Sequence, residues 1–193
     1  DMAELARKLK RAVELVRDPA EREAYIENRK AIKRPISSAW IEVSAVCNLD
    51  CITCPRQTGV TPEDLELMPL DTYYTIADAI FPKIRDVNFI GLGESLMHPQ
   101  IEKIIAYAKS KYVGVNMTSN GTIMTPKIID KIISSGLDSI AFSVDGGTKE
   151  TFEAIRVNAR FEKVKRNIKR LIEQKKQLGV ERPWIAMGLV LMK

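Results

Sequence analysis

The chain has 193 residues, of which 45% are hydrophobic and 28% charged, with 30 Lys and Arg against 25 Asp and Glu. This is the composition of an ordinary globular protein, and the length suffices for one well-buried domain. No apolar run reaches the roughly 18–20 residues of a transmembrane helix and no signal-peptide pattern is visible, so we expect no membrane association. Three cysteines within eight positions are not a secreted disulfide framework, which favours a reducing cytoplasm.

Secondary structure is indicated first by helical periodicity in residues 1–34, which ends at Pro35 and predicts an N-terminal helical extension over 1–35. The β-branched run "AWIEVSAV" predicts a first strand over 39–46. Beyond it, helices and strands alternate. Helices are predicted at 70–81, 99–109, 126–135 and 161–178, with a shorter one beginning after Thr148 and Gly136 closing the third. Strands are predicted at 86–93, 113–120, 139–145 and 183–192.

This alternation predicts an α/β domain over 36–193, with five parallel strands forming a sheet buried on both faces. Right-handed crossovers allow either a doubly wound sheet or an arc of a barrel. Because the chain ends just after a strand, we expect the domain to continue in a C-terminal portion beyond it.

Polar residues follow each of the first four predicted strands. These clusters are Cys47 to Cys54, Gly91 to Glu94, Thr118 to Gly121, and Ser143 to Gly147. Because the carboxyl ends of parallel strands meet at one edge of a sheet, we expect these side chains to share one rim.

The three cysteines are separated by three and two residues, so a short loop can bring the sulfurs of Cys47, Cys51 and Cys54 together. Soft thiolates favour zinc or an iron–sulfur cluster. Structural zinc needs four ligands, and the single histidine, His98, is predicted to cap the helix that begins at Pro99. A [4Fe–4S] cluster on three thiolates would keep one iron open, as a catalytic site requires. Free structural cysteines and zinc completed by His98 remain alternatives.

The motif "CNLDCITC" resembles the Cys-x3-Cys-x2-Cys motif of the radical S-adenosylmethionine (radical SAM) superfamily, which also follows the first strand. The resemblance covers about residues 36–193 and implies a partial (β/α)6 barrel with five strands visible. It implies that Cys47, Cys51 and Cys54 hold a [4Fe–4S] cluster whose free iron binds S-adenosylmethionine (SAM). Thr53 departs from the family, which commonly has an aromatic residue there that shields the cluster and the adenine.

The segment "GLGESLMHP" is similar to the Gly-Gly-Glu-Pro segment of the family, with an interposed Leu92 and with Ser95 in place of Pro. The resemblance implies that Gly91 and Gly93 let the backbone approach SAM and that the Glu94 carboxylate pairs with its ammonium group. The alternative is a glycine-rich turn with an exposed glutamate.

Later segments complete the implied SAM site. Ser119 and Asn120 would reach the ribose or carboxylate of SAM, although the dipeptide that starts at Asn120 also suits a simple turn. "FSVDGG" is similar to a Ser-x-Asp-Gly segment of the family, so Ser143 would contact the cofactor and Asp145 would contact it or order the loop. Arg156 matches an arginine that binds the SAM carboxylate, with a surface position as the alternative.

The resemblance implies an enzyme in which a reduced flavodoxin-like or ferredoxin-like donor supplies an electron to the cluster. SAM is then cleaved to a 5′-deoxyadenosyl radical, which removes hydrogen from a peptide, protein or small-metabolite substrate. The segments after residue 139 are similar to members with a SPASM or twitch extension. An RNA-modifying member is an alternative, though not the favoured one, because residues 149–182 carry eleven Lys and Arg against five Asp and Glu. A non-catalytic iron–sulfur or zinc module is another alternative.

Overall fold

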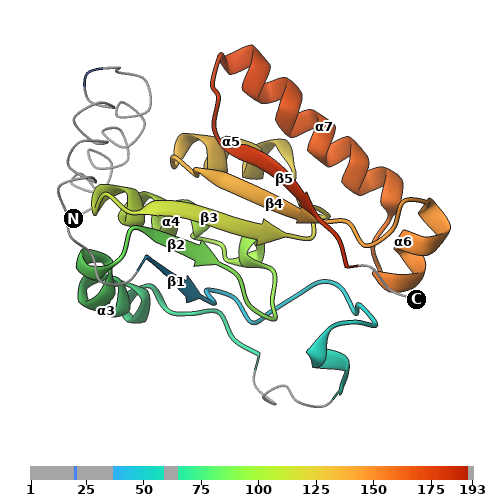
Figure 1. Cartoon of the computed structure of the whole chain (residues 1–193), viewed down its shortest axis with the longest axis horizontal. Coiled ribbons are helices and arrows are strands. Elements are labelled where there is room, and N and C mark those ends of the chain that lie inside the picture. The colour runs from blue at the N-terminus through green and yellow to red at the C-terminus, as the bar shows by residue number, and fades with distance from the viewer. Residues whose placement is uncertain (1–19, 21–36, 59–64, 191–193) are drawn as a thin grey trace.

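The computed structural model describes residue 20 and residues 37–58 and 65–190, so the predicted helical extension lies almost entirely outside the described residues. Five parallel strands form one sheet in the order β1-β2-β3-β4-β5 (Figure 1). They are β1 (Ser38–Ile41), β2 (Asp86–Phe89), β3 (Gly114–Ser119), β4 (Ser139–Ser143) and β5 (Trp184–Gly188). A sequential order winds every crossover in the same direction, so the sheet is an arc of a barrel and is not doubly wound.

Helices cover one face of this sheet. The main ones are α3 (Leu70–Ile80), α4 (Ile101–Ser110), α5 (Pro126–Ser134) and α7 (Phe161–Leu178). Each packs against the next, α3 on α4, α4 on α5 and α5 on α7. Shorter elements lie in the connections: α6 (Lys149–Ile155) and the 3-10 helices η1 (Pro55–Thr58), η2 (Phe81–Lys83) and η3 (Ser95–Met97). In the described part of the chain, no helix is long and apolar enough to cross a membrane.

Two predicted helix ends are confirmed in detail. The Thr148 side chain accepts a hydrogen bond from the Thr151 N–H and caps α6. Gly136 follows the C-cap of α5 with a positive φ of 83°, a conformation that glycine adopts without strain.

The two faces of the sheet differ, which corrects the prediction that both are buried and apolar. The face under the helices is closed by buried side chains such as Val87, Phe89, Val115, Ile140 and Phe142. The opposite, inner face carries a row of paired residues that crosses all five strands, which we call the inner row: Trp40, Asn88, Asn116, Ser139 and Trp184. Both tryptophans are exposed and the three polar residues are half-buried, as expected for the lumen side of an open barrel.

Several strands end earlier than predicted. β1 ends at Ile41 because the following residues leave the parallel ladder and pair antiparallel with residues 66–68. The Met68 N–H donates to the Val43 carbonyl, and Ser44 forms an isolated bridge with Leu67. β2, β4 and β5 likewise stop before the predicted residues 93, 145 and 192. The polar clusters therefore lie at the ends of the strands and in the loops that follow them.

Candidate functional site

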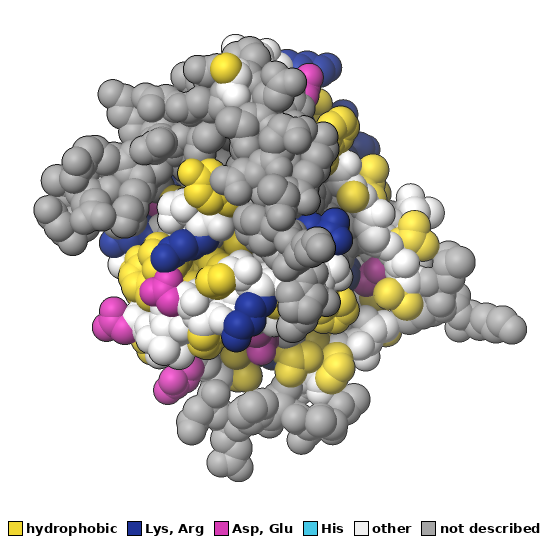
Figure 2. Space-filling view, turned by 60° about the vertical axis from the view of Figure 1, so that its left-hand side comes forward, with side chains coloured by type: hydrophobic (Ala, Val, Ile, Leu, Met, Phe, Trp, Pro, Cys, Tyr) yellow, Lys and Arg dark blue, Asp and Glu magenta, His cyan; other side chains and the backbone are white. Residues whose placement is uncertain are grey.

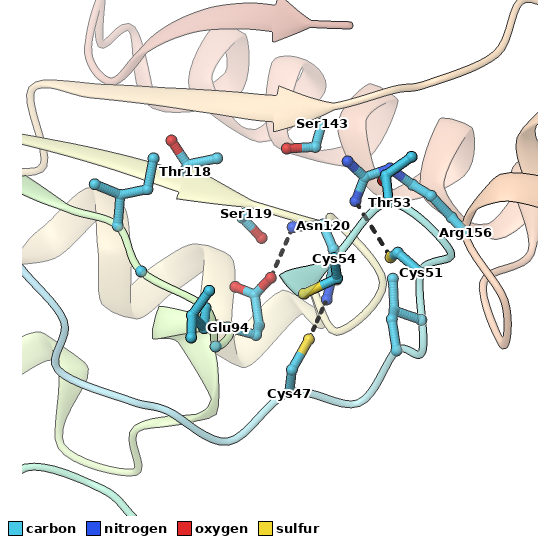
Figure 3. Close-up of a pocket in the computed structure, with 15 residues that line it drawn as sticks. Cys47, Cys51, Thr53, Cys54, Glu94, Thr118, Ser119, Asn120, Ser143 and Arg156 are labelled. Atoms are coloured by element: carbon cyan, nitrogen blue, oxygen red, sulfur yellow. Dashed lines mark hydrogen bonds between the residues drawn. The ribbon is translucent and has the colours of Figure 1, made fainter. Parts of the chain in front are cut away.

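A cavity of about 250 Å³ opens at the carboxyl ends of the strands (Figure 3). Ten of the eleven residues predicted for the cluster and SAM line it, and Asp145 lies outside the wall. The ten are Cys47, Cys51, Cys54, Gly91, Gly93, Glu94, Ser119, Asn120, Ser143 and Arg156. Other wall residues are Leu49, Thr53, Ile90, Leu92 and Thr118. The shared rim expected from the strand order is therefore present.

The cysteine loop is held against the connection between α6 and α7. Leu49 is buried in an apolar cluster with Phe152 and Val164, and Cys47 and Cys51 pack against that cluster. Backbone hydrogen bonds run from the Asp50 N–H to the Val157 carbonyl and from the Ile52 N–H to the Ile155 carbonyl, at 3.2 and 3.0 Å. The three free thiols are half-buried on this hydrogen-bonded loop.

Two nitrogen donors face the sulfurs, each at 3.9 Å: Asn120 Nδ2 near Cys47 Sγ, and Arg156 Nη1 near Cys51 Sγ (Figure 3). Burial raises the pKa of the Cys51 thiol, and the neighbouring Arg156 guanidinium partly offsets this rise. Amide and guanidinium donors beside sulfur favour the thiolate, which is the form that binds metal.

The donor set fits an iron–sulfur cluster better than a single ion. Among the described residues, no three His, Cys, Asp or Glu side chains surround a point where one metal ion could bind. A four-iron cluster bonds each thiolate to a different iron, so its ligands need not converge on one point. The ring of His98 is fully engaged, with Nε2 2.9 Å from the Met68 carbonyl and Nδ1 accepting from the Gln100 N–H. This excludes His98, as placed here, from completing a zinc site.

His98 also differs from its predicted position as a helix cap. Gln100 is the N-cap of α4, and His98 is the C-cap of the preceding η3. Its imidazole is only 3% exposed and links the start of α4 to the segment before α3. The role of His98 is therefore structural.

Glu94 is a buried residue of the cavity wall and is only 2% exposed. Its Oε2 accepts from the Asn120 N–H at 2.7 Å and its Oε1 from the Leu96 N–H at 3.1 Å. Burial raises the pKa of the Glu94 carboxyl, and these N–H donors offset part of the rise. The exposed-glutamate alternative is thus wrong, and Glu94 joins the turn after β2 to the end of β3.

Asn120 and Ser119 both shape the turn after β3 and line the cavity. Asn120 Oδ1 accepts from the Thr122 N–H, and its Nδ2 donates to Asn48 Oδ1 at 3.0 Å. The Ser119 hydroxyl accepts from the Gly121 N–H, where φ is 72°. The turn proposed as the alternative is present, and it brings Asn120 against the cysteine loop.

Arg156 is largely buried, with only 13% of its side chain exposed, so the surface alternative is wrong. Its Nη2 pairs with Asp145 Oδ2 at 2.6 Å, and Asp145 Oδ1 also accepts from the Val190 N–H after β5. Arg156 Nε is buried without a hydrogen-bond partner among the described residues. A guanidinium on a cavity wall suits a carboxylate ligand. Ser143 lies on the same wall (Figure 3).

Sequence analysis missed two polar residues that hold the site together. Glu42 Oε1 accepts from the Leu92 and Gly93 N–H groups, and Asn48 donates to the Thr122 hydroxyl at 2.8 Å. A charged residue inside the apolar run "AWIEVSAV" is the signal for Glu42, because such residues are buried only with partners.

Comparisons with known proteins identify the family of the chain. A model of the Radical SAM superfamily matches residues 41–182. The chain is 26% identical, over 160 residues, to a tungsten-containing aldehyde ferredoxin oxidoreductase cofactor-modifying protein of Pyrococcus furiosus, covering 80% of the chain and 43% of that protein. It is 30% identical over 142 residues to a GTP 3′,8-cyclase of Chlorobaculum tepidum, covering 72% of the chain and 42% of the cyclase.

Solved structures show the same fold. SuiB of Streptococcus suis, in complex with the precursor peptide SuiA, superposes with a TM-score of 0.64 at 16% identity, covering 90% of the chain and 37% of SuiB. The chain spans less than half the length of these three proteins.

Proposed function

We propose, on the premise that the chain belongs to the radical SAM superfamily, that residues 36–193 are the core of an enzyme that modifies a peptide or protein side chain. The superfamily consists of enzymes that use a [4Fe–4S] cluster and SAM. One observation carries the proposal. Three thiols and seven further predicted residues, most of them from the ends of four strands, line the same cavity. A reducing compartment such as the cytoplasm suits such a cluster.

When bound, the cluster and SAM would supply reductive cleavage of SAM and removal of a hydrogen atom from the substrate. We assign Cys47, Cys51 and Cys54 to the cluster. Arg156, held by Asp145, would bind the SAM carboxylate from the cavity wall. The remaining predicted residues, Gly91, Gly93, Glu94, Ser119, Asn120 and Ser143, would form the walls around SAM. The protein thus contributes ligation, orientation and exclusion of water.

The substrate class is argued from a second cavity of about 250 Å³ on the inner face of the sheet, which shares Ile90 and Thr118 with the first. Four residues of the inner row line it, and none of its described lining residues is charged. Carboxamides such as Asn88 and Asn116 pair well with peptide groups, whereas a phosphate would lack a cation. SuiB, which binds a precursor peptide, shares the fold. A small uncharged metabolite is the second candidate.

An electron must also reach the cluster. Ile52 follows Cys51 on the cysteine loop and is 60% exposed, and Val157, which lies across the backbone pairing of that loop, is 37% exposed. Exposed apolar residues beside a redox centre suit a transient protein contact. We therefore propose that a reduced flavodoxin-like or ferredoxin-like carrier docks on this side of the loop.

An RNA-modifying enzyme is a further candidate, favoured by one observation. The outer side of α7 exposes five basic residues, Lys163, Lys165, Arg166, Lys169 and Arg170. On the face seen in Figure 2, in contrast, the described Lys and Arg side chains are interspersed with Asp and Glu. Steep salt-dependent RNA binding that disappears when the five residues are neutralised would support this candidate over the peptide enzyme.

The proposal is tested by reconstituting the chain anaerobically with iron and sulfide and reducing the cluster with dithionite. We expect the EPR spectrum of the reduced cluster to change when SAM is added, because SAM would bind the free iron. A spectrum indifferent to SAM would instead favour the non-catalytic iron–sulfur module. A Cys51→Ala variant, which lacks one ligand, is the control for the cluster signal.

A further inference from the structure

Glu42 lies directly after β1, between the buried side chains of Ile41 and Val43, and is itself half-buried on the inner side of the sheet. One oxygen of its carboxylate, Oε1, accepts from the Leu92 N–H and, at 2.9 Å, from the Gly93 N–H. Hydrogen bonds to an ionised carboxylate are stronger than those between neutral groups. This carboxylate therefore fastens the turn after β2 to the end of β1.

The rest of that turn is fitted to the same segment. A Cβ atom on Gly91 would collide with the Glu42 carboxylate, and one on Gly93 would collide with the Ser44 carbonyl. The Glu94 N–H then donates to the Val46 carbonyl at 2.8 Å, one residue before Cys47. The turn thus lies flat along residues 42–46 and ends beside the first cysteine.

Residues from both segments form adjoining parts of one cavity wall, Cys47 from the first segment and Gly91 to Glu94 from the turn. We propose that Glu42 is a positioning residue that sets the turn against the cysteine loop and so fixes the position of Gly91 to Glu94 in the wall of the SAM cavity. This inference rests on the proposed function. Glu42 does not line the cavity, so it acts through the Leu92 and Gly93 amides.

The test compares SAM binding to reconstituted variants, titrated by the change in the EPR spectrum, with iron content measured on the same samples. In Glu42→Ala we expect the dissociation constant for SAM to rise roughly tenfold while iron content stays at the wild-type level. Glu42→Gln keeps the accepting oxygen and should bind SAM within about threefold of wild type. Glu42→Asp, whose shorter side chain cannot reach both amides, gives a milder change if the alanine variant does not fold.

Asp138→Asn is a matched control at the opposite end of the sheet. Asp138 Oδ2 also accepts a backbone N–H, from Val115 at 2.8 Å, and the carboxylate pairs with Lys109 and Arg182. Asp138→Asn should lower the melting temperature but leave SAM affinity unchanged, because it touches neither segment of the cavity wall.

Three outcomes would overturn the inference. The first is a Glu42→Ala variant, or the Asp variant in its place, that binds SAM as tightly as wild type. The second is a parallel loss of iron, which would assign Glu42 to the cluster loop itself. The third is an equal loss of SAM affinity in Asp138→Asn, which would show that SAM affinity depends on the overall stability of the fold and not on Glu42. If the wild-type spectrum does not respond to SAM, the proposed function fails instead.

Discussion

Arg156 and Asp145 form a largely buried ion pair that connects the cysteine loop to the edge of the sheet. Their atoms Nη2 and Oδ2 are 2.6 Å apart, and the two side chains are 13% and 3% exposed. The other end of the guanidinium faces Cys51, while Asp145 also holds the backbone of Val190. The orientation of Arg156 toward the cavity therefore depends on Asp145.

Removing the negative charge of this pair should destabilise the fold. Asp145→Asn keeps the shape of the side chain but leaves the largely buried Arg156 beside a neutral partner, so we expect the free energy of unfolding to fall by about 2–3 kcal/mol. Urea denaturation of the metal-free chain measures this. Glu162→Gln, which removes an exposed pair with Lys165 at 3.5 Å, is the control and should cost less than about 0.5 kcal/mol. Equal costs in the two variants would contradict the structural role given to Asp145.

The close approach of Gly93 to Ser44 predicts that no side chain fits there. Gly93→Ala forces a Cβ against the Ser44 carbonyl, and we expect a loss of about 1–3 kcal/mol in the free energy of unfolding, together with weaker SAM binding. Gly147 is the matched control, since a Cβ there would meet nothing within 4 Å. Thermal and chemical denaturation measure the stability of both variants. A Gly93→Ala variant as stable as Gly147→Ala would contradict the close packing of Gly93 against Ser44.

Burial of Glu94 predicts a pH dependence of stability. Burial raises its pKa, and the Asn120 and Leu96 N–H groups, the Ser119 hydroxyl and Arg156 offset only part of that rise. A carboxyl whose native pKa is raised stabilises the fold most below its unfolded-state pKa, and this contribution is lost as pH rises through the native value.

The corresponding measurement compares the metal-free wild type with Glu94→Gln, which does not titrate. The free energy of unfolding of wild type minus that of the variant should decrease as pH rises from about 4 to 7. A difference that stays flat or increases over this range would contradict the raised pKa.

Metal content separates the two readings of the cysteines. Alanine at Cys47, Cys51 or Cys54 should abolish stable incorporation of iron and sulfide, because each thiolate would hold a different iron. His98→Gln should keep full incorporation while lowering thermal stability, because its imidazole only links Met68 to Gln100. Zinc bound by wild type and lost in His98→Gln would reverse this assignment. Iron and zinc are measured by elemental analysis of the purified variants.

The order of the elements and the shared rim could be predicted from local patterns. Apolar runs such as those around Val115 and Ile140 mark the strands, and the helix ends at Gly136 and Thr148 depend only on neighbouring residues. Because parallel strands must present their carboxyl ends together, ten of eleven predicted residues reached one cavity. These patterns alone left a barrel arc and a doubly wound sheet open. The family resemblance implied the barrel arc, which the strand order confirms.

What the sequence could not supply were contacts between distant segments. Glu42 and Leu92 are separated by 50 positions, and no local pattern pairs them. The same holds for Arg156 and Cys51, 105 positions apart. The strand run at 39–46 is shortened because residues 66–68 compete for its backbone. His98 was predicted to cap the helix that begins at Pro99, whereas its ring is hydrogen-bonded to the carbonyl of Met68, which lies 30 positions upstream.

The central claim, that this cavity supports reductive cleavage of SAM, is tested most directly by product analysis. The anaerobically reconstituted chain is incubated with SAM and dithionite, and 5′-deoxyadenosine and methionine are quantified. We predict equal amounts of the two products, and none from Cys51→Ala. Absence of 5′-deoxyadenosine from a chain that carries its full complement of iron and sulfide would contradict the account.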